Sequence, residues 1–372
     1  MSRSLPAVRR LVVKVGSAAL VDDEGRASSR RMAKVVRELA EVAEGRSCVL
    51  VSSGAIAAGL GPLGLTRRPR DIPNLQAAAA VGQGHLMEAY ARLFARRGLV
   101  AAQVLLTQDD VMHRRQFVNA RNTFERLLAS GAIPVVNEND TVATEEIRFG
   151  DNDRLAALVA VMVKADLLVL LSDVEGIYDR DPSRTGARLI PELRDLLAVD
   201  AAGSRSGIGS GGMRSKIEAA GIASSAGTGV LVAPASRRRV LARVLEGEPL
   251  GTWIPPRGRR RTGRKAWIGF VTGPRGRILV DAGAELAVRE QGRSLLAAGV
   301  VAAEGEFQAG DAVDVAGPGG GAFARGITNY GSDEVPVIAG RTSGQLTGLP
   351  GGPYDKEVIH RDELVVVERW ER

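Results

Sequence analysis

Two clusters of amide and carboxylate side chains stand about ten residues apart near the middle of this chain. The first, Asn-Glu-Asn-Asp at 137–140, follows the apolar run 132–136, and the second, Gly-Asp-Asn-Asp at 150–153, opens a helix-like segment. Open α/β folds bind ligands at the carboxyl ends of their buried strands. We therefore expect a small polar substrate to be gripped through its amino and carboxylate groups by Asn137, Asp140 and Asn152. Asp153 fits the same site, with helix N-capping as its alternative role.

Two lysines have the chemistry to hold phosphate. Lys14 ends an apolar strand-like run and precedes Gly16, where the backbone can approach an anion closely. Lys216 follows the glycine-rich stretch 207–212 and opens the next helix-like segment. Each feature alone is weak evidence for a phosphate site, since Lys14 would also suit a solvated strand edge. Together they form a two-lysine clamp of the kind that phosphoryl transfer requires.

Two further loops offer donors for anions. Ser53 and Gly54 follow the apolar run 48–52, where a helix N-terminus would bind a carboxylate, although small residues also suit a tight packing turn. Ser172 and Asp173 follow another apolar run and could form one wall of a nucleotide pocket. The sequence has no G-x-x-x-x-G-K-[ST] loop, no protein-kinase signature and no metal-binding spacing among its three histidines.

The pattern of apolar runs predicts an α/β fold with a three-layer, open, mainly parallel sheet, followed by a small, mainly β domain. Strands are expected at 11–15, 48–52, 99–106, 132–137, 166–172 and 229–233. Helices are expected at 28–44, 75–97, 115–129, 152–164 and 213–226. We divide the chain into a catalytic domain at 1–250, a Pro/Gly/Arg linker at 251–265 and a second domain at 266–372, whose strands include 266–270, 277–280, 312–315 and 363–368.

Composition describes a globular protein of 372 residues with a formal net charge of +7. Six basic residues lie in 257–265 without an acid, whereas 266–372 carries ten basic and fifteen acidic residues. The basic excess therefore fits a solvated linker better than a nucleic-acid surface. No apolar run is long enough for a transmembrane helix, and no signal peptide is evident. The single cysteine, Cys48, excludes a disulfide framework, and we expect a cytoplasmic protein without membrane contact.

The motifs taken together resemble the amino acid kinase family and, within it, the glutamate 5-kinase branch. The specific pair is NEND at 137–140 with GDND at 150–153. The remaining matches are KVGS at 14–17, SSGAIAAG at 52–59, LLTQDD at 105–110, NARNT at 119–123, LLSDVEGIYDRDP at 170–182 and SGGMRSK at 210–216. The tail resembles a PUA domain through VDAGA at 280–284, GITNYGS at 326–332 and HRDEL at 360–364.

The resemblance implies ATP-dependent phosphorylation of the side-chain carboxylate of L-glutamate, the first step of proline biosynthesis. It implies that Lys14 and Lys216 are catalytic and that Asp153 orients them. Glutamate would be bound by Ser53, Gly54, Asn137, Asp140 and Asn152. ATP would be bound by Lys14, Gly16, Ser172, Asp173, Ser210, Gly211, Gly212, Met213, Arg214, Ser215 and Lys216. Mg²⁺ would be held mainly by ATP and water.

Two alternatives remain open from the sequence. One is a sister kinase that phosphorylates another acceptor, such as aspartate, acetylglutamate or a nucleoside monophosphate. The other is an RNA-associated protein that acts through the PUA-like tail, which the net charge of that tail disfavours. The resemblance further implies feedback inhibition by proline and assembly into a homo-oligomer.

Overall fold

The computed structural model divides the chain into two compact units, residues 1–259 and 260–372. It describes the whole chain except residues 1–4, 23, 108, 109, 112, 143–151, 181–184, 197–211, 258–264, 266, 272, 347, 348, 350–353, 355, 356 and 368–372. The predicted residues Ser210 and Gly211 lie outside the described part. Within the described residues, no helix is long and apolar enough to span a lipid bilayer.

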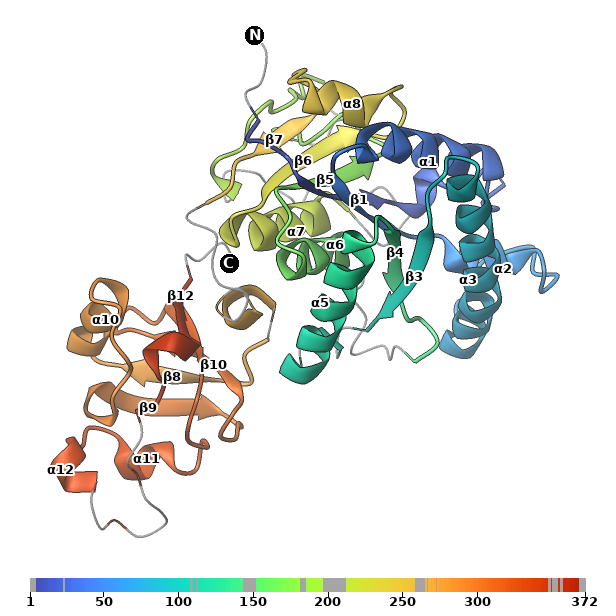
Figure 1. Ribbon diagram of the computed structural model, residues 1–372. Helices are drawn as coiled ribbons and strands as arrows, with labels where there is room; N and C mark the ends of the chain where they lie inside the picture. The colour runs from blue at the N-terminus through green and yellow to red at the C-terminus, as the bar shows by residue number, and fades with distance from the viewer. Residues whose placement is uncertain are drawn as a thin grey trace. The chain divides into compact units, whose positions relative to one another are not determined.

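Unit 1 is built on a mixed sheet with strand order β3-β4-β2-β1-β5-β6-β7 (Figure 1). Every pairing from β1 to β6 is parallel, and only β7 runs antiparallel to its neighbour. The parallel strands are β1 (Arg10–Val15), β2 (Ser47–Ser52), β3 (Ala101–Leu106), β4 (Ile133–Glu138), β5 (Leu167–Ser172) and β6 (Gly229–Pro234). All six were predicted, and the mainly parallel α/β class is confirmed.

Helices cover both faces of this sheet. They are α1 (Ser29–Ala43), α2 (Ala55–Leu60), α3 (Ile72–Ala95), α5 (Arg114–Ala129), α6 (Asn152–Met162), α7 (Met213–Ser225) and α8 (Val240–Leu245). The side chain of Ser28 caps α1 by accepting from the N–H of Arg31, and Asp71 caps α3 in the same way. The short helix α2 begins where the sequence predicted a helix N-terminus, directly after Ser53 and Gly54, whereas the short helix α8 was not predicted.

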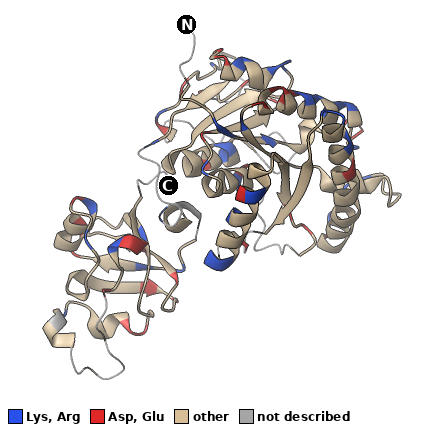
Figure 2. Ribbon diagram, viewed as in Figure 1, with Lys and Arg blue, Asp and Glu red and all other residues tan. Residues whose placement is uncertain are grey.

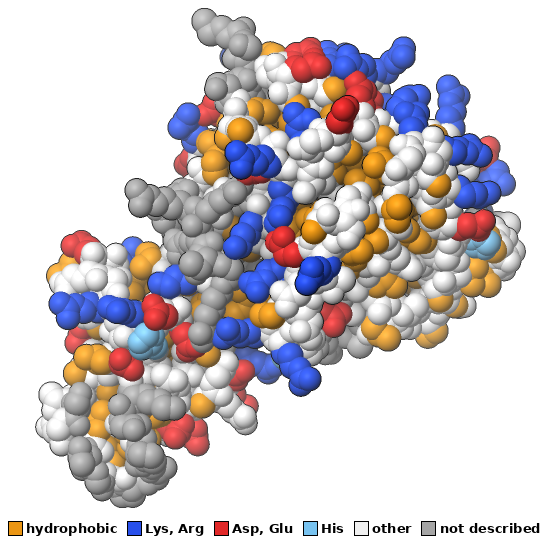
Figure 3. All heavy atoms as spheres, in the orientation of Figure 1, with side chains coloured by type: hydrophobic (Ala, Val, Ile, Leu, Met, Phe, Trp, Pro, Cys, Tyr) orange, Lys and Arg blue, Asp and Glu red, His pale blue; other side chains and the backbone are white. Residues whose placement is uncertain are grey.

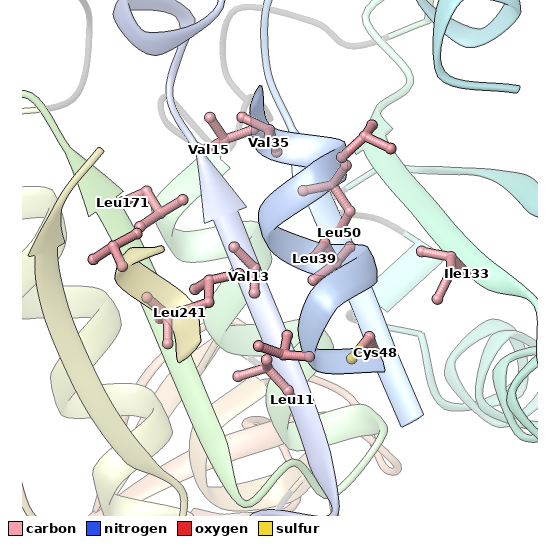
Figure 4. Packing of buried hydrophobic residues seen from close by; sticks show 14 of the residues in the cluster. Leu11, Val13, Val15, Val35, Leu39, Cys48, Leu50, Ile133, Leu171 and Leu241 are labelled. Carbon is pink, nitrogen blue, oxygen red and sulfur yellow. The ribbon is translucent and has the colours of Figure 1, made fainter. Parts of the chain in front are cut away.

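The alternating direction of the side chains along β1 determines which helices each of them contacts. Leu11, Val13 and Val15 pack with Val35 and Leu39 of α1, in a core that also takes in α3 and α8 (Figure 4). Val12 and Lys14 therefore point to the opposite face, the one covered by α6. This placement brings the lysine to the helix that begins with Asn152 and Asp153. Cys48 lies in the same buried core as Leu11, as its sequence context predicted.

Two regions differ from the sequence-based expectation. Residues 252–254, which we placed in the linker, form β7 (Thr252–Ile254) at the edge of the sheet. The hydroxyl of Thr252 accepts from the backbone N–H of Ile177 at 2.8 Å, which fixes this short strand. Of the segment 266–270, expected as a strand, residues 267–270 instead belong to a π-helical turn at Trp267–Val271. An apolar run of this length does not by itself distinguish a strand from a helical turn.

Unit 2 contains a five-stranded sheet of order β12-β11-β10-β8-β9. Its strands are β8 (Gly276–Val280), β9 (Val300–Gly305), β10 (Ala312–Ala316), β11 (Ala322–Ile327) and β12 (Leu364–Val366), with α10 (Ala282–Arg289) following β8. Val313, Val315 and Phe323 are buried in its own hydrophobic core. Basic and acidic residues occur on both units in this view (Figure 2, Figure 3). The second domain is mainly β, as predicted.

Helices α2 and α3 pack so closely that two glycines are required between them. A Cβ atom on Gly82 would lie 1.8 Å from the carbonyl oxygen of Ala55, and one on Gly59 would lie 1.9 Å from that of Ala78. Neither carbonyl can yield without breaking a helix. This contact fixes α3 against the loop at 53–54, which connects β2 to α2.

Gly82→Ala is expected to destabilise unit 1 by about 3 kcal/mol or more, because the new methyl group overlaps backbone atoms. Gly84→Ala is the matched control in the same helix, since a Cβ there meets nothing within 4 Å. That control should gain up to about 1 kcal/mol from helix propensity. Urea unfolding of both variants measures the difference, and equal stabilities would contradict the close packing.

Candidate active site

A buried carboxylate joins the two predicted lysines. The Nζ atom of Lys14 lies 2.6 Å from Oδ1 of Asp153, and the Nζ atom of Lys216 lies 2.9 Å from Oδ2. Lys14 comes from β1, Asp153 from the first turn of α6 and Lys216 from the first turn of α7. The three residues are 3%, 0% and 7% exposed. Three distant parts of the sequence thus meet at one charged centre.

The charge of Asp153 is maintained by its neighbours. Burial favours the neutral acid, but the two ammonium groups of Lys14 and Lys216 outweigh it and lower the pKa of the Asp153 carboxyl to about 2. The hydroxyl of Ser215 also lies 3.1 Å from Oδ2 of Asp153. At neutral pH the three charged groups carry a net charge of +1, so the centre attracts anions.

The polar clusters of the sequence meet in a network of amides beside this centre. The Nδ2 atom of Asn152 lies within hydrogen-bond distance of three oxygens, which are the carbonyl of Ser52 at 2.8 Å, Oγ of Ser53 at 2.9 Å and Oδ1 of Asn137 at 2.9 Å. Asn152 and Asp153 are adjacent, so α6 links the network directly to the lysines. Asp140 lies half-buried two residues beyond the end of β4.

Sequence reasoning missed two residues of α3 that support this network. Oε1 of Gln83 accepts a hydrogen bond from Nδ2 of Asn137 at 2.8 Å. The hydroxyl of Tyr90, which is fully buried, lies 2.8 Å from that of Ser52, and burial raises the pKa of the Tyr90 phenol above its usual value. The sequence feature that could have indicated them is the presence of two polar side chains seven residues apart on an alanine-rich helix.

The predicted phosphate loops provide backbone at the same edge. Gly16 follows β1, and a Cβ atom there would lie 3.5 Å from Nζ of Lys14, beside the ammonium group. Gly54 precedes α2 with a φ of 101°, a conformation that favours glycine. Gly212 precedes α7, so Met213, Arg214 and Ser215 form the first turn of that helix. Two helix N-termini therefore open toward the carboxyl edge of the sheet.

Ser172 and Asp173 lie at the carboxyl end of β5 but make no hydrogen bond to the other predicted site residues that the structure describes. The Ser172 hydroxyl is buried and hydrogen-bonds Oδ1 of Asp173 at 3.1 Å, while Asp173 is exposed. Because β5 is the neighbour of β1, this pair ends at the same edge as Lys14. Their position suits a nucleotide wall, which stays a prediction.

Comparison with known proteins identifies the family. The sequence profile of the amino acid kinase family matches residues 9–233. The chain belongs to this family. A PUA domain profile matches residues 276–347. The predicted family resemblance is therefore confirmed for both parts of the chain.

Relatives that align with the chain over nearly its whole length are glutamate 5-kinases. The chain is 50% identical over 372 residues to the glutamate 5-kinase of Salinispora arenicola, covering 99% of this chain and all of that protein. It is 50% identical to the glutamate 5-kinase of Anaeromyxobacter dehalogenans over 99% of each chain. The glutamate 5-kinase of Thermus thermophilus is 48% identical over 97% of this chain and 98% of its own length.

Asp153→Asn is expected to lower the free energy of unfolding by about 3 kcal/mol at pH 7, because two buried lysines lose their shared counter-ion. The wild type should lose this contribution as the pH falls from about 4 toward 2, since the folded-state pKa of Asp153 lies below its usual value of 3.8. The variant should lack that part of the pH dependence. Urea unfolding at several pH values measures both effects.

The double variant Asp153→Asn with Lys216→Met serves as the control for charge repulsion. It removes one of the two unpaired ammonium groups and should recover part of the lost stability. Equal stability of wild type and Asp153→Asn at pH 7 would contradict the proposed electrostatic role of Asp153.

Proposed function

We propose that this protein phosphorylates the side-chain carboxylate of L-glutamate with ATP, giving L-glutamyl 5-phosphate and ADP, the first step of proline biosynthesis. The observation that carries the proposal is the buried Lys14–Asp153–Lys216 centre beside the network of Asn137, Asn152 and Ser53. The names of the full-length relatives support glutamate as the acceptor. This arrangement pairs a phosphate-binding half with an amino-acid-binding half.

The reaction needs no general base. The side-chain carboxyl of glutamate has an ordinary pKa of about 4.3, so it is already an anion at neutral pH. One of its oxygens forms a bond to the γ-phosphorus while the bond to the β–γ bridging oxygen breaks and ADP leaves. Both reactants are negatively charged, so the main task is to bring them together and to stabilise the transferring group.

The lysines meet this electrostatic demand. Lys14 and Lys216 would contact the phosphoryl oxygens and stabilise the charge that develops during transfer. Asp153 would hold both ammonium groups in place while leaving a net positive charge. Because the centre is buried, its fields are less screened than they would be in water.

The remaining predicted residues divide between the two substrates. Glutamate would be bound by Ser53, Gly54, Asn137, Asp140 and Asn152. The nucleotide would be bound by Lys14, Gly16, Ser172, Asp173 and the segment 210–216.

Mg²⁺ would accompany ATP rather than occupy a protein cage. Among the described residues, no group of three or more His, Cys, Asp or Glu side chains is placed to hold a metal. The carboxylate of Asp153 at the centre already faces two lysines. When bound, the ion would neutralise phosphate charge, with its ligands supplied mainly by ATP and water.

Lys216→Ala is expected to lower kcat by about 10²–10³-fold, because one of two cations at the transferring group is lost. The fold should survive, since Lys14 still pairs with Asp153. A coupled assay of ADP release with L-glutamate measures turnover, and thermal unfolding checks the fold. Turnover close to that of the wild type would overturn the assigned role.

The same assay across acceptors tests the substrate. L-Glutamate should be preferred over aspartate, acetylglutamate and UMP by at least about tenfold in kcat/KM. A preference for another acceptor would instead identify a sister kinase. Proline is the proposed feedback inhibitor, and titration of the full chain with proline should raise the apparent KM for glutamate. We further propose a homo-oligomer in the cytoplasm, with light scattering as the test of assembly.

A further inference from the structure

The hydrogen-bond network of Asn137 and Asn152 extends beyond these two residues. It continues through Asn137 to Gln83, a half-buried residue on the long helix α3. Gln83 lies one residue after Gly82, whose backbone is packed against α2. The network is therefore anchored at a position of α3 that close helix packing holds fixed.

An amide side chain has one donor end and one acceptor end, so its neighbours decide its orientation. Oε1 of Gln83 accepts from Nδ2 of Asn137, which leaves Oδ1 of Asn137 facing the other way. That oxygen accepts from Nδ2 of Asn152 at 2.9 Å and from the backbone N–H of Glu138 at 2.9 Å. The acceptor on Gln83 and the backbone N–H of Glu138 together set the orientation of Asn137. Asn137 and the carbonyl of Ser52 in turn set that of Asn152.

The orientation of Asn152 has a consequence for the substrate. Its Nδ2 atom faces protein oxygens only, those of Ser52, Ser53 and Asn137. Within the part of the chain that the structure describes, no donor reaches its Oδ1 atom. A carbonyl oxygen in this position accepts hydrogen bonds and favours a cationic donor. The group on an amino acid that matches it is the α-ammonium.

We propose that Gln83 is a positioning residue that, through Asn137, turns Oδ1 of Asn152 toward the α-ammonium group of the amino acid substrate. This inference rests on the proposed function, since it assumes that the acceptor substrate is an amino acid. Gln83 acts without touching the substrate itself. It makes the site selective for an acceptor that carries an ammonium group over a dicarboxylate of the same length that lacks one.

Gln83→Leu removes the acceptor while keeping a side chain of similar size. The KM for L-glutamate should rise about tenfold, because Asn137 is no longer held in one orientation. The KM for ATP and the kcat should stay within about threefold of the wild type, because the lysine centre is unchanged. Gln83→Glu retains an acceptor oxygen and should restore the KM for glutamate to within about threefold.

Glu88→Leu is the matched control on the same helix. Its side chain is 64% exposed and forms only a long ion pair of 3.9 Å with Arg92 among the contacts described for it. All kinetic constants of this variant should stay close to those of the wild type. Thermal unfolding of all three variants checks that α3 is intact.

The discriminating measurement uses glutarate, which has both carboxylates of glutamate but no amino group. Gln83→Leu should weaken glutamate binding about tenfold while leaving the inhibition constant of glutarate within about twofold. Equal weakening of both ligands would mean general loosening and would overturn the inference, as would an unchanged KM for glutamate. If the wild type fails to phosphorylate glutamate, the proposed function fails instead, and the two failures are distinct.

Discussion

The buried carboxylate of Asp153 is the interaction on which the rest of the structure depends. Two ammonium groups, from Lys14 and Lys216, would repel each other if they were brought this close in a buried environment without an anion between them. Asp153 is fully buried and bonds both through separate oxygens. It therefore permits a net positive centre to exist in the folded protein before any phosphate is bound.

That centre constrains the surrounding secondary structure. Lys14 has to lie on the face of β1 that α6 covers. Because side chains alternate along a strand, Val13 and Val15 pack into the core on the opposite face of the sheet. Asp153 and Lys216 lie in the first turns of their helices, where the helix ends point to the carboxyl edge of the sheet. The backbones of one strand and two helices therefore hold the three charged groups in place.

The sequence predicted much of this arrangement because its signals were local. The six parallel strands appeared as continuous apolar runs, and the polar clusters at 137–140 and 150–153 marked the ends of buried elements. Gln83 and Tyr90 were missed because their role depends on how α3 packs against the ends of β4 and β2, which are distant from it in the sequence. The strand β7 was missed because its three residues were surrounded by proline, glycine and arginine, which outweighed so short a signal.

The phosphate side and the acceptor side of the site depend on different kinds of interaction. At the phosphate side, ions act over several ångströms and tolerate small displacements, which suits a group that moves during the reaction. At the acceptor side, neutral amides fix donor and acceptor directions, which suits recognition of a substrate that must not move. Asn152 and Asp153 are neighbours on α6, so one helix turn fixes the amide network and the charged centre relative to each other. A shift of that turn would disturb orientation and charge together, and the burial of most of α6 opposes such a shift.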